Sequence, residues 1–554
     1  MQEIELKFLV PESRLKGLMR QAKVKSSEVT QLAAHYYDTP DQQLAQAGIG
    51  LRIRKEGDTW VQTIKAGGDG IAARLEHNAV LDNEQVQAML DNNELMPDLT
   101  IYKNTSIAPA LADFKLKKLT KKLTRLYVTD VERTTRLLID DSDEAANNQI
   151  EMAYDDGDII HGNDDDKRDA IQEIEFELIS GDIDFLFATA KTWCKRYKLC
   201  LSTVTKAERG GLLITEQTHS PAVNADLKQM TINKKTSLPA FIRAAVHNCL
   251  LQILPNSSAI VAGSKEDEHI LQLYIGIARL TAALQMFADY SDEVNPEWLL
   301  ILNQTARLLD GYHELGYVAS DIEPNLQRHG APIVDWTADI DALKITPKDA
   351  VSANDFQLTL LELIAFTMSD PSIEPRADKR VIDKLANTFS NQYAKFANAA
   401  HNLQSNPHSG SDITKSANDN IKGIDSADDD SQTIGSDSVN LASLDVEDPI
   451  HEQALHELHH QLEILHYGSE FAAPLLDKKK SKKKTKRMLK HLLKAKKAVA
   501  QYRNHAQYQQ RYQLKSLTNT NACYGAGWFA AMLIRDQKHA EKRLAKVKDI
   551  SVLF

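Results

Sequence analysis

Apolar and charged residues alternate strictly at the start of the chain. In the stretch EIELKF the charged residues Glu3, Glu5 and Lys7 alternate with three apolar ones. A β-strand places successive side chains on opposite faces, so this pattern predicts a strand with one charged face and one apolar face. Taken alone, such a strand would keep its apolar face on the core and its charges in water.

The same alternation recurs through residues 1–215, in short segments separated by Gly, Asp and Asn. The turn sequences EGDT, AGGDG and DDGD lie between these segments at hairpin spacing,. Two helical stretches interrupt them, near residues 11–24 and 183–198. This region is therefore expected to form an antiparallel sheet or barrel with flanking helices.

The second half of the chain has a helical pattern. After a polar linker at 216–234, apolar residues recur with a period of about 3.6 in 235–402 and again in 448–554,. Between these halves, residues 403–447 are rich in Ser, Asp, Asn and Gly, a composition that predicts a disordered insertion,. The fold class is thus expected to be multi-domain α+β, with an all-helical C-terminal part.

Composition narrows the function classes. A net charge of −11 disfavours general nucleic-acid binding, although residues 478–497 are strongly basic and form either a solvated helix face or an anion site,. The four cysteines lack the spacing of a zinc site or a disulfide framework,. Neither a secretory signal nor a membrane-spanning run is apparent, so a cytoplasmic protein is expected,.

Charges of each sign are grouped by strand in the first half. Acids gather on the first and late segments, including the triplet Glu173, Glu175 and Glu177, whereas Arg52 and Arg54 lie on a middle one. Carboxylates suit Mg²⁺ or Mn²⁺, and the planar fork of arginine suits phosphate. We therefore expect an inside-out barrel with a polar lumen, suited to metal-assisted phosphoryl transfer without a covalent nucleophile.

These motifs resemble the CYTH family, the triphosphate tunnel metalloenzymes. EIELK resembles the ExExK signature of that family, and further matches follow in the family's order: YYDTP, LRIR, WVQTIK, ARLE, TDVER, IEMAYDDG, EIEFEL and TKAERG. The resemblance implies an eight-stranded antiparallel β-barrel tunnel with its charged face inside. It also implies a divalent metal ion, Mg²⁺ or Mn²⁺, as cofactor.

Roles for individual residues follow from the same resemblance. It implies metal binding by Glu3, Glu5, Glu173 and Glu175, with Glu177 as an additional acidic group. The catalytic set would be Glu3, Glu5, Lys7 and Glu175. Substrate binding would fall to Lys7, Arg52, Arg54, Lys65, Arg74, Arg133, Lys206 and Arg209. Glu76, Glu151 and Asp155 would serve a second ion or align water, and Asn78 stands where many relatives have another carboxylate, which predicts a weaker second metal site.

The helical half resembles a CHAD domain, which is built from two similar halves and is associated with polyphosphate binding. The helix face that is basic in the family reads Leu271, Tyr274, Ala278 and Thr281 in the first half, and His456, His459, Glu463 and His466 in the second. The resemblance therefore extends to the CHAD fold and not to its anion site. Weak polyphosphate binding would need protonated His456, His459 and His466 or the basic segment 478–497,. The alternative is a stabilising or partner-binding platform.

The combined resemblance is to bacterial CYTH-CHAD inorganic triphosphatases. It implies hydrolysis of inorganic triphosphate to pyrophosphate and phosphate, with that triphosphate as the partner and with no membrane or specific nucleic acid involved. The alternatives are a thiamine triphosphatase, a class IV-type adenylate cyclase and a non-catalytic polyphosphate-binding protein. Intact acidic strands at both Glu3 and Glu173 favour an enzyme over a binder.

Overall fold

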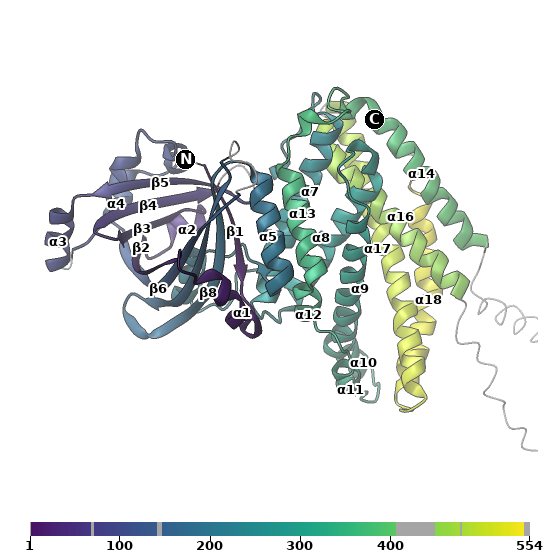
Figure 1. The fold of residues 1–554 in the computed structure, drawn as a ribbon. Helices are drawn as coiled ribbons and strands as arrows, with labels where there is room; N and C mark the ends of the chain where they lie inside the picture. Colours follow the sequence, from purple (N-terminus) through teal and green to yellow (C-terminus); the bar gives the residue numbers. More distant parts are fainter. Residues whose placement is uncertain are drawn as a thin grey trace, which may run out of the picture.

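The chain folds into a β-barrel that lies beside a bundle of long helices (Figure 1). The computed structural model describes residues 2–67, 71–92, 94–140, 147–405, 449–476 and 479–547. Most of the insertion expected to be disordered lies outside the described residues.

Eight antiparallel strands close the barrel. They are β1 (Gln2–Leu9), β2 (Glu28–Asp38), β3 (Gly50–Glu56), β4 (Thr59–Gly67), β5 (Ala73–Leu81), β6 (Thr124–Ile139), β7 (Gln149–His161) and β8 (Asp164–Ser180). The strand order is β5-β4-β3-β2-β6-β7-β8-β1, and β5 pairs again with β1 where Glu3 lies opposite Arg74. A two-residue strand, β9 (Cys200–Leu201), extends β1. The predicted eight-stranded barrel is confirmed.

The strands of this barrel are oriented opposite to the expectation for an isolated surface strand, because their apolar side chains pack on the outer face of the barrel. Leu6 and Phe8 of β1 are buried on the outer face, where Phe8 contacts Phe176 edge to face and Phe176 contacts Trp193 of α5 (Ile183–Tyr197). On β1 and β8 this apolar packing occupies the outward parity, and Glu3, Glu5, Lys7 and Glu175 on the other parity point into the lumen,.

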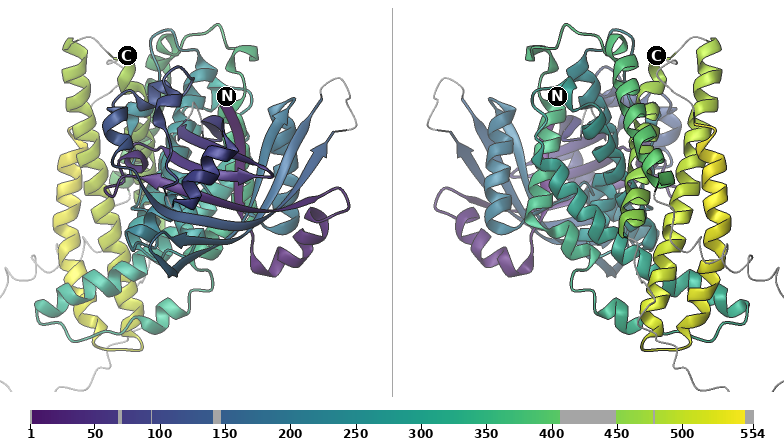
Figure 2. Two further views of the ribbon diagram at one scale, coloured as in Figure 1. Left: turned by 90° about the vertical axis from the view of Figure 1, so that its left-hand side faces the viewer. Right: turned by 90° about the vertical axis from the view of Figure 1, so that its right-hand side faces the viewer.

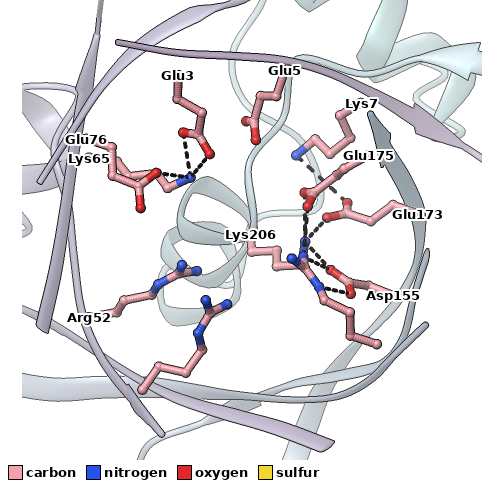
Figure 3. A network of polar contacts seen from close by, with 12 residues as sticks. Glu3, Glu5, Lys7, Arg52, Lys65, Glu76, Asp155, Glu173, Glu175 and Lys206 are labelled. Carbon is pink, nitrogen blue, oxygen red and sulfur yellow. Dashed lines mark hydrogen bonds and ion pairs between the residues drawn. The ribbon is translucent and has the colours of Figure 1, made fainter. Parts of the chain in front are cut away.

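Short helices flank the barrel: α1 (Glu12–Ala22), α2 (Gln43–Gln46), α3 (Asn83–Asp91), α4 (Leu116–Thr120), η1 (Leu99–Tyr102) and η2 (Ala108–Leu111). Helix α6 (Lys206–Ile214) lies across one end of the tunnel (Figure 3). Its first turn is capped by Thr205, which accepts from Glu208 N,. A Cβ at Gly210 would lie 2.2 Å from the Tyr127 ring, so glycine allows α6 to dock this closely.

The rest of the chain is helical. Its helices are α7 (Leu238–Val261), α8 (Asp267–Met286), α9 (Glu297–Tyr317), α10 (Glu323–Arg328), α11 (Thr337–Asp341), α12 (Pro347–Ser352), α13 (Asn354–Met368), α14 (Val381–Ser405), α16 (Pro449–Ala472), α17 (Lys479–Ser516) and α18 (Ala522–Leu544), with the short turns η3 (Leu227–Gln229), η4 (Ala288–Tyr290), η5 (Val318–Ile322), η6 (Pro371–Ile373) and η8 (Ala473–Leu475). Ser237 caps α7, and α17 and α18 form a long hairpin (Figure 2).

One continuous hydrophobic core joins the barrel to the helices. Phe8 and Phe176 on the outer face of the barrel belong to the same buried cluster as Phe241 of α7 and Leu360 of α13. Helix α5 packs between the two parts (Figure 1). In the described part of the chain, no helix has both the length and the apolar character needed to cross a membrane.

Candidate active site

The lumen of the barrel holds a cavity of about 830 Å³ with a highly charged lining. Figure 3 shows the charged side chains of β1, β3, β4, β5, β7, β8 and α6 pointing into it. The charged lining residues are Glu3, Glu5, Lys7, Arg52, Arg54, Glu56, Lys65, Arg74, Glu76, Arg133, Glu151, Glu175, Glu177 and Lys206.

Three carboxylates meet on β7 and β8. Oxygens of Asp155, Glu173 and Glu175 lie within 4.8 Å of one another, and Asp155 and Glu173 are 0% and 1% exposed. Lys206 Nζ lies 2.8 Å from Asp155 Oδ2 and 2.9 Å from Glu175 Oε1, and it also contacts Glu173. Arg133 donates to Asp155 Oδ2 at 2.6 Å and to Glu175 Oε2 at 2.8 Å. Two cations therefore balance the cluster, which allows three acids to lie this close together in a buried place.

Lys7 borders this cluster from β1. Its ammonium lies 3.8 Å from Glu173 Oε2 and donates a hydrogen bond to the carbonyl of Val204. The Lys7 side chain is almost fully buried, and burial lowers its pKa,. Glu173 Oε2 is buried without a hydrogen-bond donor in the described structure, so this oxygen keeps capacity for a further ligand,.

A second charged group lies on β1, β4 and β5. Lys65 Nζ lies 2.7 Å from both carboxylate oxygens of Glu3 and 2.8 Å from Glu76 Oε2. Burial, with the neighbouring charge of Glu5, raises the pKa of Glu3 to about 8. Burial also opposes ionisation of Glu76, but Lys65 and hydrogen bonds hold its pKa at about 2. Arg74 of β5 belongs to the same charged group and donates to Glu5 at 2.6 Å.

Arg52 differs from the other cations of the lumen. It donates to the Tyr36 hydroxyl at 3.3 Å, while its Nε is buried without an acceptor. Within the described ranges, no carboxylate lies within ion-pair distance of Arg52, whereas Arg54 is paired with Glu56. A buried guanidinium without an acid is suited to an anionic ligand.

The remaining acids lie next to one another on three strands. Glu177 of β8 pairs in register with Glu5 of β1 and Glu151 of β7. Burial and these two neighbours raise the pKa of Glu177 to about 7. Asn78 donates to Glu76 at 2.8 Å and accepts from Thr63 at 2.7 Å.

The structure brings most of the predicted site residues together, with two differences. Arg209 lies one helical turn beyond Lys206, where it donates to Asp169 at 2.8 Å and lines a separate cavity. Asp155, predicted only as an accessory acid, lies at the centre of the main acidic cluster. Sequence reasoning missed Tyr36, which stacks on Tyr127 at 4.8 Å and contacts Arg52. The YYDTP motif, which begins with Tyr36, is the sequence feature that could have indicated this residue.

The face of the helical region that would be basic in a CHAD domain is largely neutral here. Lys496 donates to the Tyr467 hydroxyl at 2.7 Å, and Arg503 lies 3.3 Å from His459 Nδ1. Burial lowers the pKa of His456, His459 and His466. These histidines therefore stay neutral near pH 7, and the structure gives no support to polyphosphate binding through their protonation.

Replacing His466 with glutamine should flatten the acid dependence of stability. Burial, with Lys496 and Arg279 nearby, lowers the pKa of His466 to about 3, against an ordinary value of about 6.5,. Below about pH 6.5 the unfolded chain binds a proton that the folded state does not, so His466 costs about 2 kcal/mol of stability at about pH 5 and nothing at about pH 8. Urea unfolding of the wild type and H466Q at both pH values measures this. The exposed His401→Gln variant is the control, and an equal pH dependence in all three proteins would refute the prediction.

Comparison with protein families identifies both parts of the chain. Residues 1–210 match the CYTH domain and residues 244–513 match the CHAD domain. The CYTH match spans all eight strands of the closed barrel with its charged lumen. The chain thus carries a CYTH domain at residues 1–210 and a CHAD domain at residues 244–513.

One curated relative and two solved structures are similar to this chain. The inorganic triphosphatase of Haemophilus influenzae is 30% identical over 223 residues, which cover 39% of this chain and little more than half, 56%, of the relative. The CHAD domain from the plant Ricinus communis is 14% identical with a TM-score of 0.41, covering 60% of this chain and 98% of that one. HpAC1 from Hippeastrum, an adenylyl cyclase candidate with a dominant triphosphatase activity, is 14% identical with a TM-score of 0.28, covering 39% and 96%.

Proposed function

We propose that the tunnel hydrolyses inorganic triphosphate to pyrophosphate and phosphate with Mg²⁺ or Mn²⁺. The observation that carries this proposal is the close group of Asp155, Glu173 and Glu175 in a lumen that also holds Arg52, a cation with no acid within ion-pair distance in the described structure. Acids suit a divalent ion, and unpaired arginine suits phosphate oxygens. The name of the Haemophilus influenzae relative supports the same activity.

The acidic cluster fits a divalent cation. Asp155, Glu173 and Glu175 offer three close oxygens, and Glu173 keeps one oxygen without a hydrogen-bond donor. These residues would hold the ion. Glu3 and Glu5 are paired with Lys65 and Arg74, as the cluster is paired with Lys206 and Arg133, and they would be further ligands once those cations turn to the substrate. A bound Mg²⁺ or Mn²⁺ neutralises phosphate charge and lowers the pKa of water.

The cations of the lumen act on the substrate. Arg52 can hold phosphate oxygens with its fork, and Lys65, Arg74 and Arg133 can exchange a carboxylate for a phosphate as triphosphate enters,. Lys7 and Lys206 add positive charge beside the acidic cluster. Barrel walls and α6 shield these interactions from water, which strengthens them.

The proposal is tested by phosphate release from tripolyphosphate, thiamine triphosphate and ATP with Mg²⁺ or Mn²⁺. Tripolyphosphate should be the best substrate, and Glu5→Gln should lower its hydrolysis at least about a hundredfold, because the change keeps size and removes a charge from the lumen,. The matched control is Glu132→Gln, an exposed acid on the outside of β6. Equal activity of E5Q and wild type would refute the proposed site. A preference for thiamine triphosphate or ATP would show that inorganic triphosphate is not the main substrate.

A further inference from the structure

The barrel wall has a seam beside the candidate active site. Strand β1 pairs with β5 over residues 2–4 and with β9 over residues 8–9, and it changes from one partner to the other at residues 5–7, where Glu5 N still donates to the Ala72 carbonyl at 3.0 Å. A small cavity of about 30 Å³ lies there, lined by Glu5, Lys7 and Arg74 on the barrel side. Leu254 of α7 and Ile364 of α13 close it from the helical side. The helical region, residues 235–402, therefore closes this seam from outside the barrel.

The segment between β9 and α6 holds Lys7 at this seam. Ser202 N donates to the Lys7 carbonyl at 2.9 Å, and the Lys7 ammonium donates to the Val204 carbonyl. Both the main chain and the side chain of Lys7 thus depend on residues 201–204. A displacement of this segment would move the ammonium relative to Glu173.

Two buried polar side chains of the helical region form hydrogen bonds with the main chain of this segment. Gln357 of α13 accepts from Leu201 N at 2.8 Å and donates to the Val351 carbonyl at 2.7 Å. It is 0% exposed. Because both ends of its amide are used, its orientation is determined.

Ser258 of α7 holds the same segment two residues further along the chain, at Thr203. Its hydroxyl accepts from Thr203 N at 3.0 Å and donates to the Leu254 carbonyl at 2.7 Å. Ser258 is 1% exposed. Buried amide groups of the segment would lose their partner if either side chain were removed, and the segment would then shift to find another.

We propose that Ser258 and Gln357 are positioning residues, through which the CHAD region holds Lys7 in the tunnel. This inference rests on the proposed function, because Lys7 is assigned there to neutralise substrate charge. Neither side chain lines the lumen, so each acts on triphosphate only through residues 201–204 and Lys7. A misplacement of about 1 Å in a charged group is enough to slow catalysis.

Double-mutant cycles with Lys7→Met separate positioning from general structural support. Ser258→Ala and Gln357→Met should each lower kcat for tripolyphosphate about tenfold and weaken its binding, and neither should have a further effect in the K7M background. Measuring the Kd of tripolyphosphate by calorimetry alongside kcat closes the cycle even where turnover is very slow. The matched control is Ser257→Ala, a neighbouring residue that is 1% exposed and whose hydroxyl has no hydrogen-bond partner in the described structure.

The outcomes are distinct. Effects that vanish in K7M support positioning, and effects of the same size with and without Lys7 overturn it in favour of general destabilisation. An active wild type with unchanged S258A and Q357M also overturns it. A wild type that releases no phosphate from tripolyphosphate contradicts the proposed function instead.

Discussion

Glutamine in place of Glu175 should reduce tripolyphosphate hydrolysis by about a thousandfold. Glu175 belongs to the acidic cluster and contacts both Lys206 and Arg133. Burial opposes its ionisation, but Lys206, Arg133 and Lys7 hold its pKa well below the usual value. The substitution keeps the shape, removes a fixed negative charge and weakens any divalent ion held there. Phosphate release at saturating Mg²⁺ measures the loss.

Glu177→Gln is the matched control for this prediction. Glu177 is the next lumen-facing acid on β8, but it lies outside the cluster and its pKa is raised to about 7. Its replacement should lower activity less than about tenfold. Equal losses in E175Q and E177Q would show that the ion is held across β8 rather than by Asp155, Glu173 and Glu175.

Methionine in place of Lys206 should destabilise the metal-free protein by about 3–5 kcal/mol. Lys206 contacts Asp155, Glu173 and Glu175, so its removal leaves buried negative charge with less compensation. Its own pKa is raised, because these acids outweigh the effect of burial. Denaturant unfolding with a chelator measures the loss of stability.

Added Mg²⁺ distinguishes a charge effect from a packing effect in this variant. If the cluster binds the ion, Mg²⁺ should stabilise K206M more than wild type, since it replaces the missing cation. Lys167→Met, which breaks the exposed pair with Glu216, should change stability little with or without the ion,. A K206M protein that is destabilised equally in chelator and in Mg²⁺ would argue against an ion at the cluster.

The sequence was sufficient to predict the barrel and most of its charged lining. Alternation shows which residues share a face, so Glu3, Glu5 and Lys7 could be assigned together from β1 alone. It does not show which strands become neighbours or in what register. Asp155 joins the main cluster because β7 and β8 place it opposite Glu173, and Glu3 meets Lys65 because β5 closes the barrel against β1.

Two further features depended on contacts that periodicity does not encode. Arg209 follows Lys206 by one turn of α6, and the rise of the helix carries it to Asp169 at the rim of the barrel,. The helical period of residues 235–402 correctly predicted that this region, which includes α7, is helical. Nothing in that pattern indicated that Leu254 and Ser258, on the same helix, would reach the seam beside Lys7.

The position of α6 affects how a ligand can enter the tunnel and how products can leave it. Because this helix lies across one end, a ligand would enter and leave by the opposite end. Under the proposed function, arriving triphosphate and departing phosphate would pass the same arginines in opposite directions. Clearance of the products, rather than cleavage of the bond, can become the step that limits turnover as phosphate accumulates.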